Sequence, residues 1–152
     1  MAIERVVVTN RKATYLYEIL ETHEAGLVLR GTEVKSLREG KANFKDSYAR
    51  VEKDEAWLVG CHISPYRHGS DANHDPERPR KLLLHRGEIN RLLGKVQERG
   101  LTLVPLRLYF KQGRAKLELG LGRGRKLHDK RRAIREREMR REMDKAVRSR
   151  ER

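Results

Sequence analysis

The chain has 152 residues and a single cysteine, Cys61, so it can form one domain with an appendage but neither an internal disulfide nor a cysteine-rich zinc site. No apolar run approaches the ~20 residues of a membrane-spanning helix, and the N-terminus has no secretory pattern, so we expect a cytoplasmic protein. The net charge of +14 favours a polyanionic partner: RNA, DNA or an anionic membrane.

The first elements predicted along the chain are a β-hairpin and a short helix. Residues 14–21 alternate in part and are rich in β-forming side chains, residues 23–26 supply a turn, and residues 27–29 continue as a second strand. Residues 31–40 begin with glycine and a capping threonine and end at a glycine, which is typical of a short helix.

Two further strands are predicted near residues 47–52 and 55–63. In the second, an alternating set of side chains is expected to point inward: Trp57, Val59, Cys61 and Ile63. Residues 65–79 contain proline, glycine and three Asn or Asp residues, which indicates a loop. A loop of this length inside a compact domain is usually functional or mobile.

The clearest helix is predicted over residues 86–99, where apolar side chains recur at i, i+3, i+4 and i+7 before Gly100 ends the pattern. Strands near residues 102–110 and 114–121 follow. Pro105 cannot donate a backbone hydrogen bond, so its strand should lie at a sheet edge or be bulged there.

These elements predict a mainly β, α+β domain over residues 1–122. Six short strands with embedded helices favour a closed β-barrel of the oligonucleotide-binding type, the OB-fold. No alternation of strands and helices of the parallel α/β kind is present, and the sequence contains no internal repeat.

Residues 123–152 form a basic tail with 14 Lys and Arg against 6 Asp and Glu, a net charge of +8. From Asp129 onward it lacks glycine and proline and consists mostly of helix-forming residues. Its apolar residues make only a thin stripe, so little packing would hold a helix. We expect a tail that is disordered or frayed alone and folds as a helix on a polyanionic surface.

The junction GLGRG, residues 120–124, superficially matches a dinucleotide-binding loop. That fold needs a packed helix and a further strand after the glycines, and the sequence here offers a helix charged all round. We interpret the glycines as a hinge. The following cations, Arg123, Arg125 and Lys126, are the expected start of a second RNA-facing surface.

Several residues carry side chains that can bind a metal or take part in catalysis. The set His62, His68, Asp71, His74 and Asp75 matches no known zinc spacing, so polar loop residues are the simpler interpretation. The sequence has no nucleophile elbow and no recognisable carboxylate pair. We therefore expect no enzyme, no metal and no cofactor.

Cations mixed with apolar and amide side chains point to RNA. Asn10 and Lys12 precede the first predicted barrel strand, and Arg80 and Lys81 come directly before three leucines, residues 82–84. The chain has only eight Phe, Trp and Tyr residues in total, too few for a typical reader of single strands. Structured RNA, which is recognised by shape, phosphates and unpaired bases, is the better fit.

A wider resemblance runs in order along nearly the whole chain. It is carried by NRKATYLYEILETHEAGLVLRGTEVKSLREGKAN, DSYARV, HISPY, NHDPERPRKLLLH, TLVPLRLYF and GRGRKLHDKR. These segments resemble the small protein B (SmpB) family, the SsrA-binding proteins of bacterial trans-translation.

The resemblance implies an OB-type barrel that binds the tRNA-like domain of transfer-messenger RNA (tmRNA) and stands in for an anticodon arm. It also implies delivery of that RNA to stalled ribosomes, with the tail helical in the mRNA channel near the decoding centre. We expect a monomer bound one per RNA, with tmRNA and small-subunit ribosomal RNA as partners and no membrane.

The resemblance also assigns residues. The expected tmRNA-binding set is Asn10, Lys12, Glu24, Arg80, Lys81, Leu83 and Lys116. The expected ribosome-binding tail motif is Gly124, Arg125, Lys126, His128, Asp129, Lys130 and Arg131, with GRK where the family commonly has GKK. His128 is expected to stack on a ribosomal base.

Two other functions stay open from the residues alone. One is a ribosomal or general structured-RNA-binding OB protein with a basic tail. The other is a metal-dependent hydrolase that uses His62, His68 and His74.

Overall fold

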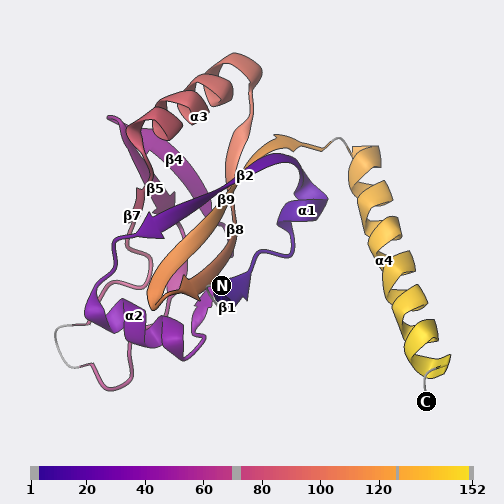
Figure 1. Ribbon diagram of the computed structural model, residues 1–152, viewed down its shortest axis with the longest axis horizontal. Coiled ribbons are helices and arrows are strands. Elements are labelled where there is room, and N and C mark those ends of the chain that lie inside the picture. Colours follow the sequence, from indigo (N-terminus) through magenta and orange to yellow (C-terminus); the bar gives the residue numbers. More distant parts are fainter. Residues whose placement is uncertain (1–3, 70–72, 126, 151–152) are drawn as a thin grey trace.

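The computed structural model describes residues 4–69, 73–125 and 127–150, which form an α+β body followed by a C-terminal helix (Figure 1). Seven antiparallel strands make one sheet in the order β1-β8-β9-β2-β7-β5-β4, and β3 pairs separately with β6. The strands are β1 (Glu4–Thr9), β2 (Tyr17–Leu27), β3 (Ala42–Asn43), β4 (Tyr48–Glu52), β5 (Glu55–Val59), β6 (His62–Ile63), β7 (Arg80–Leu83), β8 (Thr102–Lys111) and β9 (Arg114–Gly124). The helices are α1 (Ala13–Leu16), α2 (Gly31–Arg38), α3 (Arg86–Arg99) and α4 (Leu127–Arg150).

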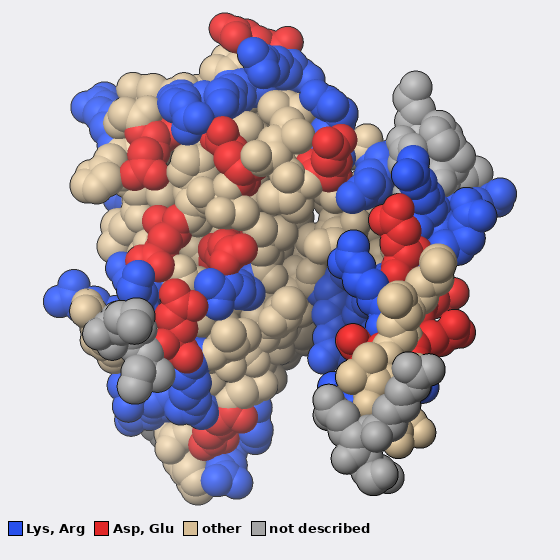
Figure 2. Space-filling model, turned by 45° about the vertical axis from the view of Figure 1, so that its right-hand side comes forward, with Lys and Arg blue, Asp and Glu red and all other residues tan. Residues whose placement is uncertain are grey.

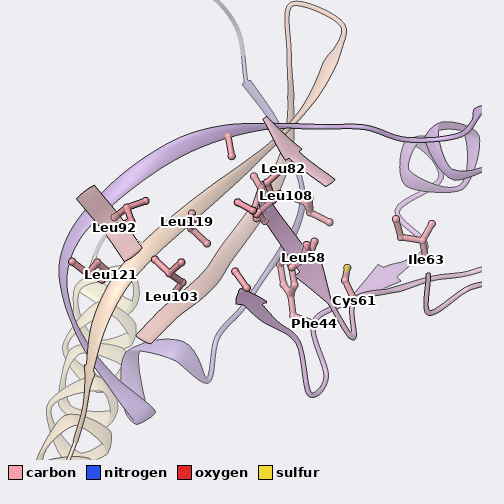
Figure 3. Packing of buried hydrophobic residues seen from close by; sticks show 14 of the residues in the cluster. Phe44, Leu58, Cys61, Ile63, Leu82, Leu92, Leu103, Leu108, Leu119 and Leu121 are labelled. Atoms are coloured by element: carbon pink, nitrogen blue, oxygen red, sulfur yellow. The ribbon is translucent and has the colours of Figure 1, made fainter. Parts of the chain in front are cut away.

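The sheet curls around one hydrophobic core (Figure 3). The alternation predicted for β9 is confirmed, because Leu117, Leu119 and Leu121 point inward and are at most 1% exposed. Helix α3 contributes the fully buried Leu92, so the predicted helix over 86–99 covers the core as its apolar pattern indicated. Leucines of β5, β7 and β8 complete the centre of the core: Leu58, Leu82 and Leu108.

The predicted closed barrel is confirmed only in part. The structure has the large curled antiparallel sheet with helices, but closure of the sheet into a barrel is not confirmed. The strand order ends at β1 and β4, and no ladder joins these two strands in the described part of the chain. Strand β4 comes close to β8. However, β1 pairs only with residues 107–111 of β8, and no ladder joins β4 to the rest of that edge in the described part of the chain.

The hairpin predicted over residues 14–29 is wrong. Residues 13–16 form α1, and β2 then runs without a turn through residues 23–26, which pair with β9 from His23–Leu119 to Gly26–Lys116. Gly26 does not turn the chain but makes room, since a Cβ there would lie 3.2 Å from Cβ of Leu83.

The inward face predicted for residues 55–63 is half right. Trp57 and Val59 are only half-buried, because Ala56 and Leu58 of the same strand take the core positions. The strand then ends at Gly60, whose φ of +76° suits glycine and reverses the alternation. Cys61 and Ile63, beyond that break, are buried as expected.

Other elements agree with expectation or were not foreseen. The helix α2, the loop before β7 and the bulge near Pro105 are confirmed, the last as a register shift between Pro105 and Arg107. Strands β1, β3 and β7 were not predicted. Within the residues described, no helix combines the length and the apolar character needed to span a membrane.

Strand β9 continues to Gly124, so the hinge interpretation is wrong for two of the three glycines. A Cβ on Gly120 would lie 2.9 Å from Cδ1 of Leu106, and one on Gly122 would lie 3.1 Å from Cβ of Tyr17. These glycines are paired strand residues that allow close packing against neighbouring strands. Gly124 has open space around it.

Helix α4 stands beside the body, next to α1 (Figure 1). The Arg137 guanidinium lies 4.8 Å from the ring centre of Tyr15, and Arg125 Nε donates to the Thr14 carbonyl at 3.2 Å. The apolar stripe of α4 is exposed, with 41–66% of each residue accessible to solvent: Ile134, Met139, Met143 and Val147. That the tail is frayed when alone and folds on a polyanion stays a prediction.

Candidate nucleic-acid interface

Three residues of the expected tmRNA-binding set lie together on the outer face of the curled sheet. Leu83 of β7 and Lys116 of β9 are both paired with Gly26 of β2, so they flank one glycine in a row across three strands. Glu24 lies two residues before Gly26 and therefore on the same face. The missing side chain of Gly26 leaves a hollow lined by all four residues, which we call the outer-face hollow.

Leu83 presents apolar surface to solvent at this hollow. It is 53% exposed, whereas its neighbour Leu82 is 1% exposed and belongs to the core. An exposed leucine beside a lysine offers packing surface for an unpaired base together with a charge for its phosphate.

Glu24 is held in place as a carboxylate. It accepts hydrogen bonds from Tyr109 Oη at 2.6 Å and from Lys111 Nζ at 3.3 Å. The Tyr109 hydrogen bond outweighs partial burial and, with Lys111, holds the pKa of Glu24 below its ordinary value. The oriented, ionised carboxylate has lone pairs left to accept from a base N–H or a 2′-hydroxyl.

Asn10 and Lys12 lie at a different hollow, between α1 and the β3–β4 connection. Asn10 Nδ2 donates to the Pro105 carbonyl at 2.7 Å, which ties this corner to β8. Arg11 and Lys45 join Asn10 and Lys12 in lining the hollow, which has a volume of about 780 Å³. The expected set therefore falls on two regions rather than one.

Arg80 is a correction to the expected set, because its side chain is fully buried. Its Nε donates to Glu33 at 2.6 Å, and its terminal nitrogens donate to the carbonyls of Cys61 and Pro76. A guanidinium with these partners and no exposed surface cannot contact RNA in this conformation. Arg80 instead holds α2 and the loop before β7 against the sheet.

The carboxylate of Glu33 is the centre of that buried network. Besides Arg80, it accepts from Arg78 Nη2 at 2.5 Å and from the Arg30 backbone N–H at 2.7 Å. Burial on its own raises the pKa of Glu33, but these hydrogen bonds outweigh burial and hold it below the ordinary value. The carboxylate is therefore ionised and has partners on both oxygens, although the buried Nε of Arg78 has none among the described residues.

Lys81 and part of the tail motif are on the surface. Lys81 Nζ lies 3.6 Å from Glu55 Oε1, with 41% of its side chain exposed. Gly124 and Arg131 are exposed and Arg125 is half-buried. Lys126 and the side chains of three further motif residues lie outside the described part: His128, Asp129 and Lys130.

Positive charge gathers in several places on the visible surface. Figure 2 shows Lys and Arg side chains along α4, over the end of the body that α3 covers, and at the opposite, lower end of the body. Several cations of α3 have acidic partners, since Arg91 and Lys95 both bind Glu21. The tail, residues 123–152, therefore carries a larger net positive charge than the body.

His62 and His74, two of the three histidines considered as metal ligands, hydrogen-bond to other groups in the structure. His62 Nδ1 lies 2.9 Å from Glu77 Oε1, while buried His74 donates from Nε2 to the Ile63 carbonyl and accepts at Nδ1 from the Thr32 hydroxyl. These contacts hold the loop before β7 in place. Among the described residues, a group that excludes Asp71, no three potential ligands converge.

Tyr109, which positions Glu24, is not among the residues expected at the site from the sequence. Arg107 stacks over its ring at 4.3 Å and in turn binds Glu118 and Glu4. The alternation of Arg107, Tyr109 and Lys111 along one strand was the available signal.

Comparison with known proteins gives one consistent result. The family model described as "SmpB protein" matches residues 7–149. The chain is 61% identical over 145 residues to an SsrA-binding protein of Desulforudis audaxviator, covering 95% of both chains. It is 62% identical over 140 residues to one of Syntrophobacter fumaroxidans, covering 92% of this chain and 87% of the relative. A chain of the solved structure "tmRNA-SmpB: a journey to the center of the bacterial ribosome" is 56% identical, with a TM-score of 0.68 over 84% of this chain and 94% of that one.

Proposed function

The chain belongs to the SmpB protein family, and on that basis we propose that it binds the tRNA-like domain of tmRNA and delivers it to stalled ribosomes for trans-translation. The observation that carries the proposal is the match over residues 7–149, with relatives named for SsrA binding that cover more than nine tenths of the chain. The protein acts as an adaptor without catalysis, as a monomer bound one per RNA, in the bacterial cytoplasm where ribosomes work.

The curled sheet serves as an OB-type RNA-binding body. At the outer-face hollow, Leu83 packs on an unpaired base, Lys116 neutralises a phosphate, and Glu24 accepts from a base or a ribose hydroxyl. Asn10 and Lys12 supply a second contact at their own hollow. Lys81 of β7 adds a further positive charge to the RNA-binding face. Two separated regions suit a folded RNA, which touches a protein through its shape rather than through one short segment.

The tail, residues 123–152, forms the ribosome-facing part. Its net charge of +8 and its exposed helix favour a polyanionic groove such as the mRNA channel of the small subunit. The motif from Gly124 to Arg131 leads from β9 into this helix. The body in this arrangement takes the place of an anticodon arm, while the tail reaches the decoding centre.

Sequencing the RNA that co-purifies with the protein from a bacterial cell tests this function. One dominant tagging RNA is the expected result. A general structured-RNA-binding protein would instead bring down a spread of ribosomal RNA fragments, and that outcome would overturn the proposal. A preparation washed in high salt is the control, because contacts made by charge alone are lost as salt rises.

A further inference from the structure

Trp57, the only tryptophan of the chain, lies on the outer face of the sheet rather than in the core. Its neighbours Ala56 and Leu58 are each 1% exposed, while Trp57 is half-buried and lines a surface hollow of about 360 Å³. The other residues that line this hollow are Arg50, Glu52, Lys53, Glu55 and Pro79. We call it the Trp57 hollow.

The strand register places a cation on each side of Trp57. Arg50 of β4 is its partner on one side and Lys81 of β7 its partner on the other, so guanidinium, indole and ammonium form one row across three strands. Adjacent strands are about 4.8 Å apart, which puts both cations within reach of a phosphate attached to a group stacked on the ring.

Both cations are available for a phosphate. Arg50 Nε lies 3.5 Å from Glu52 and Lys81 Nζ lies 3.6 Å from Glu55, in ion pairs whose side chains are between 41% and 55% exposed. Such exposed pairs are weak and exchange partners readily. The two carboxylates can in turn accept from an amino group on a base edge.

This row continues into the outer-face hollow. Lys81 and Leu83 are alternate residues of β7 and so share a face. Leu83 is therefore one strand over and two residues along from Trp57, roughly 8 Å away between Cα atoms by ordinary sheet spacing. Because β5 lies directly beside β7, the Trp57 hollow is one strand away from an RNA held at Leu83 and Lys116 (Figure 1).

We propose that Trp57 is a stacking platform for an unpaired base of the bound RNA, with Arg50 and Lys81 binding the phosphates on either side of that base. The inference rests on the proposed function, since it extends the RNA-binding face of the body by two strands. A flat aromatic ring between two cations is the arrangement by which sheet proteins hold splayed bases. A protein partner fits the Trp57 hollow less well, because Trp57 is the only large apolar side chain that lines it and the charged side chains around it are in weak ion pairs.

Trp57 emission tests the proposal in the unmodified protein, since no other tryptophan contributes. A transcript of the tRNA-like domain of tmRNA is titrated in, and its binding is measured in parallel by gel shift. Stacking predicts saturable quenching with the same apparent affinity as the gel shift, and no quenching by a fully paired RNA duplex of equal length. Binding without any change in emission, or equal quenching by the duplex, would overturn the stacking role and leave the proposed function standing.

Two substitutions add an independent measurement. Trp57→Ala is expected to weaken binding by about 5- to 100-fold, and Trp57→Phe, which keeps a ring, by no more than about threefold. Circular dichroism of each variant shows that it is folded. Equal losses for both variants would contradict stacking. Absence of RNA binding by the wild-type protein would overturn the proposed function and this inference together, and an emission change seen only with added protein would assign the hollow to a protein partner.

Discussion

Replacing Arg80 by alanine should lower the free energy of unfolding of the protein, and not only weaken its binding to RNA. The substitution removes one of three donors from the buried carboxylate of Glu33 and leaves the carbonyls of Cys61 and Pro76 without their partner. Breaking a buried ion pair costs about 3–5 kcal/mol. Glu33 keeps Arg78 and the Arg30 N–H, so we expect the lower end, about 3 kcal/mol in the free energy of unfolding.

Urea unfolding followed by circular dichroism measures this loss. Lys81→Ala is the matched control, because Lys81 is the next residue and its exposed ion pair should change stability by no more than about 0.5 kcal/mol. The pKa of Glu33 is depressed in the folded state, so the stability it contributes is present above its unfolded pKa and is lost as pH falls. The difference in the free energy of unfolding between wild type and Arg80→Ala should therefore become smaller as the pH falls.

Partial recovery is expected when Glu33 and Arg80 are both replaced by apolar residues. In the double variant Glu33→Leu with Arg80→Met, no buried carboxylate remains and Arg78, whose side chain is 23% exposed, can still reach water, so the stability of this variant should exceed that of Arg80→Ala. An Arg80→Ala protein that is as stable as wild type but binds RNA poorly would refute the structural role and return Arg80 to the RNA-binding set.

The remaining predictions concern the RNA-binding body and the tail. Truncation after Gly124, which keeps β9 whole, should leave tmRNA binding within about threefold of the full chain in gel shifts but abolish peptide tagging in a reconstituted translation reaction; loss of RNA binding would contradict the two-part model. Lys116→Ala should lower the slope of log affinity against log salt by about 1, while Lys41→Ala, exposed beside Glu39, should leave it unchanged. Tyr109→Phe removes the strongest influence that depresses the pKa of Glu24, so a carboxyl NMR titration should find that pKa shifted upward. The stability that Glu24 contributes is lost as pH falls through its folded pKa, so this loss should be smaller in the Tyr109→Phe variant, and an unchanged titration would show that the hydrogen bond does not form.

Elements with a strong local signal could be predicted from the sequence. Helix α3 has an uninterrupted apolar period and a terminating glycine, and β9 alternates strictly, so both came out correctly. The signals failed where tertiary packing decides. Gly26 looks like a turn residue, yet it lies in a continuous strand because Leu83 occupies the space that a side chain would take. Gly60 reverses an alternation that otherwise appears continuous, which hid the outward position of Trp57.

The candidate site shows the same division. Residue type and family resemblance led to Glu24, Leu83 and Lys116, and strand register brings Leu83 and Lys116 to one row and all three residues to one hollow. They also led to Arg80, because it is a cation in a segment, residues 80–84, that was expected to contact RNA. Only the fold reveals that α2 places Glu33 beneath it. Burial of a charged pair between distant segments leaves no local signal in the sequence.

The most direct test of the account is the affinity of the protein for the tRNA-like domain of tmRNA at fixed salt. The wild-type protein is compared with the double variant Leu83→Ala with Lys116→Ala and with Lys41→Ala as the control. We predict that wild type binds this RNA more tightly than an unrelated folded RNA of equal length, and that the double variant loses at least about tenfold. The control should stay within about twofold of wild type. Equal affinity for both RNAs, or a double variant that binds as well as wild type, would contradict the claim that this face of the sheet recognises tmRNA.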